Sequence, residues 1–295
     1  MNNALFRGSG TAMVTPFSEG AVDFPALGRL IDLQITAGTD ALIVLGTTGE
    51  PPTLTADEKE RILSFALERA DGRIPVIAGC GGNSTKDVAR RAKRMEEMGA
   101  DALLTVTPYY NKTTQPGLIA HYTAIADAVS IPIILYNVPS RTGMNLLPDT
   151  AEALSHHPNI RGIKEASGNI SQIAELAART RGRLTLYSGN DDQVLPIMAL
   201  GGAGVISVAG NVIPETMREL AHSCLTGDMD RARALQDSIL PLAAQLFAEV
   251  NPIPVKAALH ILGLCSPEVR LPLLPLSAER RAALQEAMAR EGASI

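Results

Sequence analysis

The sequence predicts an α/β fold, a (β/α)8 TIM barrel followed by a C-terminal helical extension. Three observations support this prediction: short apolar segments recur along the chain, amphipathic segments separate them, and each pair spans roughly 20–30 residues. The eight apolar segments are Thr11–Phe17, Ala41–Gly46, Pro75–Cys80, Ala102–Pro108, Pro132–Pro139, Ile160–Ala166, Leu184–Gly189 and Gly204–Ala209.

The apolar segments are continuous runs rather than alternations of apolar and polar residues. Continuous runs are typical of parallel strands that are buried on both faces. A Gly, Pro, Ser or Thr ends or directly follows each run, where a strand would end. The alternative fold is a doubly wound open sheet, but no GxGxxG motif follows the first run.

The segments between the strands contain helix boundaries. Thr55-Ala56-Asp57-Glu58 is a capping box, which predicts a helix from Ala56 to Ala70 that ends at Asp71-Gly72. Ser84 is placed to begin the next helix and Gly99 to end it.

The chain changes character after about residue 210, where no further strand is predicted. We therefore expect a catalytic barrel over residues 1–225 and a helical extension over residues 226–295 that packs on it. The helices predicted in this last part are Pro214–Thr226, Asp228–Glu249, Pro254–Leu262 and Ser277–Arg290.

Composition excludes several classes of function. The 295 residues are 46% apolar and 19% charged, which allows a large core, and the net charge of −5 argues against nucleic acid or anionic membranes as partners. No segment has the length of a membrane span, and the N-terminus lacks the apolar core of a signal peptide. Three widely spaced cysteines fit a reducing compartment, so a cytoplasmic location is expected. The histidines lie in helix-like segments, and no metal site is expected.

Lys164 is the most informative residue of the chain. It is one of six lysines and lies within the short apolar strand Ile160–Ala166. Desolvating an ammonium is costly, and a neutral amine can attack a carbonyl carbon to form a Schiff base. The alternative is that Lys164 lies at a strand end and extends into solvent.

Hydroxyl groups are expected to converge on Lys164. Strand ends of a parallel barrel meet at one face, and four of the five tyrosines fall at predicted strand ends. Tyr136 and Thr47 occupy the ends of their strands, so both can face the same region as Lys164. An amine with hydroxyls that transfer protons is what a Schiff-base aldolase needs. Tyr136 could instead be a core residue, Thr47 could cap the next segment, and Arg141 could form a surface ion pair.

Seven sequence motifs, spread over nearly the whole chain, resemble one family. The motifs are GTTGE at 46–50, VTPYYN at 106–111, YNVPSRTG at 136–143, GIKEA at 162–166, SGND at 188–191, GVISV at 204–208 and NPIPVK at 251–256. Through them the chain is similar to the dihydrodipicolinate synthase / N-acetylneuraminate lyase family of pyruvate-dependent class I aldolases.

The resemblance implies roles for individual residues. Lys164 would form a covalent Schiff base with pyruvate, with no other cofactor, and Tyr136, Thr47 and Tyr110 would form the proton relay. Tyr110 would act in the site of a neighbouring subunit, which implies at least a dimer and typically a tetramer built as a dimer of dimers. Arg141 would bind the carboxylate of aspartate semialdehyde.

The resemblance also implies a pyruvate-binding region. Thr48 and backbone groups around Gly189 and Ile206 would hold or border pyruvate. The implied reaction condenses pyruvate with aspartate semialdehyde to 4-hydroxy-tetrahydrodipicolinate, in the diaminopimelate and lysine pathway. The alternative is a related lyase or aldolase that acts on a sugar-derived 2-keto acid, of the sialate lyase or 2-keto-3-deoxygluconate aldolase type. Arg141 and the GTTGE motif favour the first reaction.

One departure from the family pattern concerns regulation. Members that lysine inhibits bind it at the dimer interface through polar residues after the GTTGE motif. Pro51, Pro52, Ala56 and Lys59 occupy these positions here, and Lys59 would repel an ammonium ligand. We therefore expect weak or absent feedback by lysine.

Overall fold

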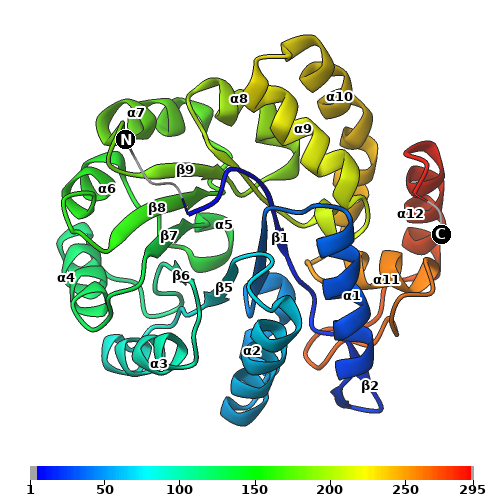
Figure 1. Cartoon of the computed structure of the whole chain (residues 1–295), viewed down its shortest axis with the longest axis horizontal. Helices are drawn as coiled ribbons and strands as arrows, with labels where there is room; N and C mark the ends of the chain where they lie inside the picture. The colour runs from blue at the N-terminus through cyan, green and yellow to red at the C-terminus, as the bar shows by residue number, and fades with distance from the viewer. Residues whose placement is uncertain (1–4, 294–295) are drawn as a thin grey trace.

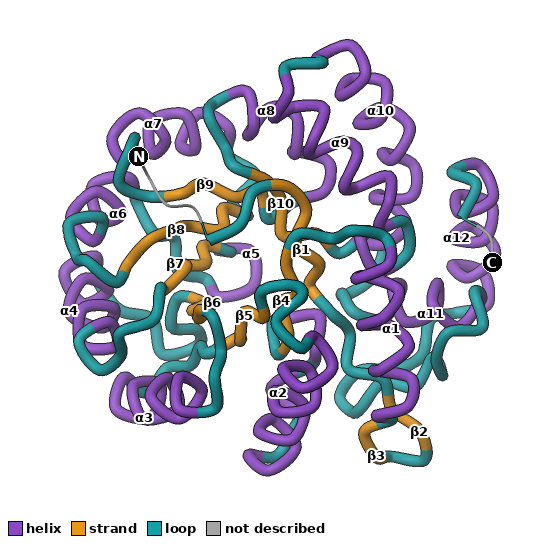
Figure 2. The backbone as a smooth tube through the Cα atoms, viewed as in Figure 1, coloured by secondary structure: helices purple, strands orange, loops and turns teal. Residues whose placement is uncertain are grey.

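Eight parallel strands close into a barrel, in the order β1-β10-β9-β8-β7-β6-β5-β4 (Figure 1). This computed structural model describes residues 5–293. The strands form the centre of the molecule and helices surround them (Figure 2). The predicted barrel is therefore confirmed.

The barrel strands are short and almost entirely buried, as parallel strands covered on both faces should be. Arg161 is the one exposed residue among them. The strands are β1 Gly8–Ala12, β4 Ala41–Val44, β5 Val76–Gly79, β6 Ala102–Val106, β7 Ile133–Asn137, β8 Ile160–Glu165, β9 Thr185–Ser188 and β10 Gly204–Ser207. The last seven lie within the segments predicted for them.

The first strand was predicted at the wrong place. It begins at Gly8 rather than Thr11, and Phe17–Ser18 forms a separate small hairpin, β2, with β3 at Ala21–Val22. The sequence Gly-Ser-Gly lacks the apolar side chains that usually indicate a strand. Space explains this choice of residues, because a Cβ on Gly10 would lie 2.7 Å from Ile43 Cδ1. Neighbouring large side chains already fill the barrel there.

The helices between the strands follow the predicted boundaries. Thr55 and Glu58 form the capping box at the start of α2, and Asp71 ends that helix in the left-handed conformation. Ser84 caps α3. The helices up to residue 226 are α1 Phe24–Thr36, α2 Ala56–Ala70, α3 Thr85–Glu97, α4 Gln115–Ala126, α5 Pro139–Thr142, α6 Pro148–Leu154, α7 Ile170–Thr180, α8 Val194–Ala199 and α9 Pro214–Thr226, with 3-10 turns η1 Thr47–Gly49, η2 Pro51–Thr53, η3 Asp191–Gln193 and η4 Ala209–Asn211.

The N-terminal end of the barrel is closed by aromatic side chains. The ring of Phe6 stacks on that of Tyr187 with their centroids 4.4 Å apart, and the Tyr187 hydroxyl donates a hydrogen bond of 2.9 Å to the Phe6 carbonyl. Burial raises the pKa of Tyr187. With this end filled, the opposite end of the barrel is left for a site.

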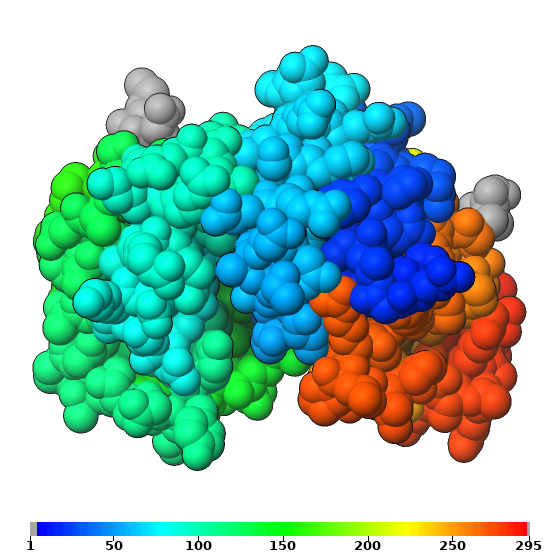
Figure 3. All heavy atoms as spheres, turned by 90° about the horizontal axis from the view of Figure 1, so that it is seen from below, coloured from blue at the N-terminus to red at the C-terminus, as the bar shows by residue number. Residues whose placement is uncertain are grey.

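Three further helices form a C-terminal part on one side of the barrel (Figure 1): α10 Met229–Leu246, α11 Ile253–Ile261 and α12 Ala278–Arg290. The segment between α11 and α12 packs against the N-terminal part of the chain. In Figure 3 these two parts are the orange and the dark blue atoms, which lie against each other. Gly20 donates its N–H to Glu268 at 2.8 Å and accepts from Arg270 Nη2 at 2.7 Å. No helix within residues 5–293 is long and apolar enough to cross a membrane.

Arg270 also joins the C-terminal part to helix α2. Its guanidinium donates to both carboxylate oxygens of Glu58, at 2.9 and 2.6 Å. Arg270 lowers the pKa of Glu58 to about 2, chiefly through these hydrogen bonds. A carboxyl group whose pKa is lower in the folded protein than in the unfolded chain stabilises the fold at pH values above its ordinary pKa. This stabilisation is lost as the pH falls towards the lowered pKa.

Replacing Glu58 with glutamine tests this contribution. Glu58→Gln keeps a capping-box residue but removes the ion pair, so we expect a loss of about 1 kcal/mol in unfolding free energy at neutral pH. The difference from the parent should shrink as the pH falls from about 4.5 towards 2. Urea unfolding at several pH values measures it. A difference that is constant across this range would contradict the assignment, and Glu60→Gln provides a control at a more exposed ion pair.

Candidate functional site

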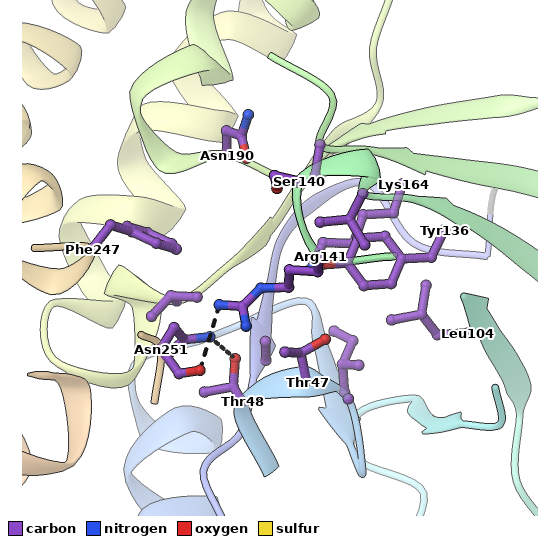
Figure 4. A pocket seen from close by; sticks show the side chains of 17 residues that line it. Thr47, Thr48, Leu104, Tyr136, Ser140, Arg141, Lys164, Asn190, Phe247 and Asn251 are labelled. Carbon is purple, nitrogen blue, oxygen red and sulfur yellow. Dashed lines mark hydrogen bonds between the residues drawn. The ribbon is translucent and has the colours of Figure 1, made fainter. Parts of the chain in front are cut away.

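A cavity of about 670 Å³, counting its open mouth, lies at the C-terminal ends of the barrel strands (Figure 4). The loops after β4, β7, β8 and β9 line it, together with residues of the C-terminal part. The residues around it are Ala12, Ile43, Gly46, Thr47, Thr48, Leu104, Tyr136, Val138, Ser140, Arg141, Lys164, Ala166, Gly189, Asn190, Val208, Phe247 and Asn251. This is the face on which barrel enzymes bind their substrates.

Lys164 lies in β8 and its side chain lines the cavity. Tyr136 of β7 is its partner in the strand register, and Lys164 Nζ lies 4.5 Å from the centre of the Tyr136 ring. Only 5% of Lys164 and 7% of Tyr136 is exposed. No carboxylate forms an ion pair with Lys164 among residues 5–293. A buried amine that forms no direct ion pair is a suitable nucleophile for a carbonyl carbon.

Gly189 makes room for the lysine side chain. A Cβ at this position would lie 3.0 Å from Lys164 Cε and 2.7 Å from Ala166 Cβ. Any larger residue would press on the lysine or on the strand that carries it. Gly189 therefore borders the cavity, and the absence of its side chain keeps the space beside the amine open.

Thr47 and Thr48 enter the site from the loop after β4. Thr47 is half-buried and lines the cavity. Thr48 is buried, and its Oγ1 accepts a hydrogen bond of 2.9 Å from Asn251 Nδ2. The loop is thus held from the side of the C-terminal helices.

Arg141 lies in α5, directly after β7, and its guanidinium extends across the cavity towards Asn251 (Figure 4). Arg141 Nη2 donates a hydrogen bond of 3.4 Å to the Asn251 carbonyl oxygen. The residue is exposed, and no carboxylate pairs with it within the described part of the chain. Its planar donors are suited to a carboxylate that enters from solvent.

Two predicted site residues lie outside the cavity. Tyr110 is 93% exposed, in the loop after β6, with φ of 62°. A tyrosine whose backbone lies in the left-handed region and whose side chain faces solvent is unusual. Ile206 is fully buried in β10, paired with Gly10, and Val208 lines the cavity in its place. The roles assigned to Tyr110 and Ile206 stay predictions.

Several residues that line the cavity had no role predicted from the sequence, among them Phe247 and Asn251. Both belong to the C-terminal part, far along the chain from the strand ends. Asn251 begins the NPIPVK motif, so the family resemblance was the one signal that could have drawn attention to it. Phe247 had none, because a helix-end phenylalanine is ordinary in sequence.

Two buried carboxyl groups lie close to the lysine. Asp191 Oδ2 accepts from the N–H groups of Val208, at 3.1 Å, and Ala209, at 2.8 Å. Burial raises the pKa of Asp191, and it also raises the pKa of Glu165, which Asn137 holds by hydrogen bonds. Within residues 5–293, no three His, Cys, Asp or Glu side chains group as metal ligands.

The chain is similar to known proteins over nearly its whole length. A sequence model of the dihydrodipicolinate synthetase family matches residues 5–291. The chain belongs to this family. It is 51% identical over 293 residues to the 4-hydroxy-tetrahydrodipicolinate synthase of Caldicellulosiruptor bescii, covering 99% of each protein.

Solved structures agree with this assignment. The dihydrodipicolinate synthase of Aquifex aeolicus is 47% identical, with a TM-score of 0.96 over 98% of this chain and 99% of that one. The chloride-inhibited dihydrodipicolinate synthase of Acinetobacter baumannii, solved in complex with pyruvate, is 44% identical, with a TM-score of 0.96 over 97% and 99%. Membership of this family confirms the resemblance that the seven motifs indicate.

Proposed function

We propose that this protein condenses pyruvate with aspartate semialdehyde to 4-hydroxy-tetrahydrodipicolinate. The observation that carries the proposal is the buried Lys164, unpaired with any carboxylate in the described chain, 4.5 Å from the ring of Tyr136 in a cavity that Arg141 crosses. Relatives that match this chain over almost its whole length are named for this reaction.

The first half of the reaction makes a carbon nucleophile from pyruvate. The Lys164 amine adds to the keto carbon, and the carbinolamine loses water to give an imine. The positive imine nitrogen withdraws electrons, so a proton can leave the methyl carbon and an enamine forms. The imine is itself the electron sink, and for this reason the proposal includes no separate cofactor.

The second half joins the two substrates. The enamine carbon attacks the aldehyde carbon, which forms the new carbon–carbon bond and leaves a hydroxyl. The amino group that aspartate semialdehyde brings then attacks the imine carbon, closes the ring and displaces the Lys164 amine. The enzyme is thereby restored.

Each of these steps moves a proton, and we assign that work to Tyr136, Thr47 and Tyr110. Tyr136 and Thr47 both line the cavity that holds the amine. Tyr110 is 93% exposed, which fits a residue that enters the site of a neighbouring subunit. We therefore propose a homo-oligomer of at least two subunits, and a tetramer built as a dimer of dimers.

The remaining site residues hold the substrates. Thr48 and the backbone around Gly189 and Ile206 would border pyruvate, and Arg141 would bind the carboxylate of aspartate semialdehyde. We propose residues 1–225 as the catalytic barrel and 226–295 as the helical extension, in a cytoplasmic protein. The alternative, a lyase for sugar-derived 2-keto acids, has less support, because the relatives from Caldicellulosiruptor bescii and Aquifex aeolicus both carry the synthase name.

The amine of Lys164 is tested by trapping. Borohydride added with pyruvate should leave a reduced adduct on the Lys164 peptide in mass spectrometry. In an assay coupled to dihydrodipicolinate reductase and NADPH, Lys164→Ala should lose at least about 1000-fold in kcat, while Lys86→Ala, at an exposed helical lysine, should match the parent. An adduct that persists in Lys164→Ala would contradict the assignment.

The guanidinium of Arg141 is tested by substrate affinity. Arg141→Ala should raise the KM for aspartate semialdehyde roughly 10- to 100-fold, because it removes charge-assisted hydrogen bonds, and should leave the KM for pyruvate nearly unchanged. Arg141→Lys keeps the charge but not the planar donor pair, so an intermediate value is expected. Equal increases in both KM values would argue against a role in selecting the aldehyde.

Feedback by lysine is expected to be weak or absent. Lys59 is half-buried, and burial together with the charge of Arg91 lowers its pKa, so two cations already share this region. Inhibition by lysine should have a constant weaker than about 1 mM, and Lys59→Ala should strengthen it if charge repulsion is the cause. Strong inhibition of the parent at micromolar lysine would overturn this expectation.

A further inference from the structure

A buried ion pair connects the loop after β4 to the C-terminal helices. Lys256 Nζ lies 2.5 Å from Glu50 Oε1, and the two side chains are 0% and 1% exposed. Glu50 ends the GTTGE motif and Lys256 ends the NPIPVK motif. Neither residue lines the cavity, and the proposed reaction gives neither a part.

The loop that Glu50 ends has a strained backbone on both sides of Thr47. Leu45 has φ of 59° and Glu50 has φ of 55°, although neither is a glycine. Non-glycine residues in this left-handed region persist only where the surroundings fix them. The turn Thr47–Gly49 lies between these two residues, so its position depends on what holds them.

The C-terminal part supplies three of four polar contacts that join this loop to the rest of the chain. The Glu50 carboxylate receives the Lys256 ammonium and, at 3.2 Å, the backbone N–H of Arg270. Asn251 Nδ2 donates to Thr48 Oγ1 at 2.9 Å. From the barrel, Thr15 Oγ1 adds one hydrogen bond of 2.8 Å, to the Gly49 carbonyl.

Lys256 is itself fixed in place. Its ammonium donates to the Glu268 carbonyl at 2.8 Å and lies 3.9 Å from the centre of the Phe17 ring. Burial lowers the pKa of Lys256, while the charge of Glu50 opposes this effect. A buried ion pair of this kind contributes little net stability compared with apolar residues of the same size. The distinctive feature of the Glu50–Lys256 pair is therefore its position between the loop after β4 and the C-terminal part, rather than the free energy that it adds to folding.

We infer that the Glu50–Lys256 pair is a positioning device that holds the Thr47 hydroxyl where it can exchange protons with Tyr136. Proton exchange between Thr47 and Tyr136 rests on the proposed function. Fixation of the loop by the ion pair does not, since it follows from the strained backbone of the loop and from its contacts. Glu50 and Lys256 are positioning residues, because they touch no reacting atom.

Neutral variants of similar size separate this role from ordinary stabilisation. Glu50→Gln and Lys256→Met alone each leave one buried charge unpaired, so both should lower Tm strongly. The double variant leaves no unpaired charge and should recover most of the lost Tm. In amide hydrogen exchange, however, residues 46–50 of the double variant should exchange faster than in the parent, while the strands keep their protection.

Kinetics test the connection to Thr47. The double variant should lose roughly 10- to 100-fold in kcat, with the KM for pyruvate nearly unchanged. Adding Thr47→Val to it should cost little more, because the hydroxyl is already displaced, whereas independent effects would multiply. Leu284→Ala, in the buried face of α12, is the control: it should lower Tm without changing kcat or the exchange of residues 46–50.

The outcomes separate the inference from the proposed reaction. Unchanged exchange of residues 46–50 in the double variant would overturn the inference, whatever reaction the protein catalyses. Multiplicative losses with Thr47→Val would also overturn it, because the pair would then act elsewhere. Faster exchange in a protein that does not condense the two substrates would support the role of the pair in the loop and reject the proposed reaction.

Discussion

The arrangement of the site depends on one constraint, a lysine amine buried inside a closed barrel with no ion pair among residues 5–293. Lys164 has no direct ion-pair partner there, although its charge offsets part of the rise in the pKa of the buried Asp191, and burial is unfavourable for an ammonium. The structure around it fits this constraint: Gly189 leaves space beside the side chain, and the Tyr136 ring lies next to the amine. A fold that only needed stability would have an apolar residue there.

The C-terminal part is more than a cover for the barrel. Phe247 and Asn251 line the cavity, and Asn251 contacts both Thr48 and Arg141. Through Asn251 and Lys256 the same part of the chain contacts the loop after β4. The barrel therefore supplies the proposed nucleophile, and the C-terminal part holds the loop and the arginine around it.

Predictions from the sequence succeeded where interactions between residues close in the chain determine the structure. The capping box at Thr55 and the strand around Lys164 were placed correctly, because capping hydrogen bonds and apolar runs depend on neighbouring residues. The first strand was misplaced, because its small residues are selected by Ile43 on another strand. The exposed position of Tyr110 could not be derived from its neighbours in sequence either.

The sequence by itself determined the fold class, the family and the residue that makes the proposed chemistry conceivable, since each depends on local patterns or on motifs. Only the tertiary structure decided how the site is held. Asn251 and Thr48 are 203 residues apart in the chain, and Glu50 meets Lys256 only after the barrel has closed and the C-terminal helices have packed on it. A hydrogen bond or ion pair requires atoms within a few ångströms, and sequence separation does not reveal such approach.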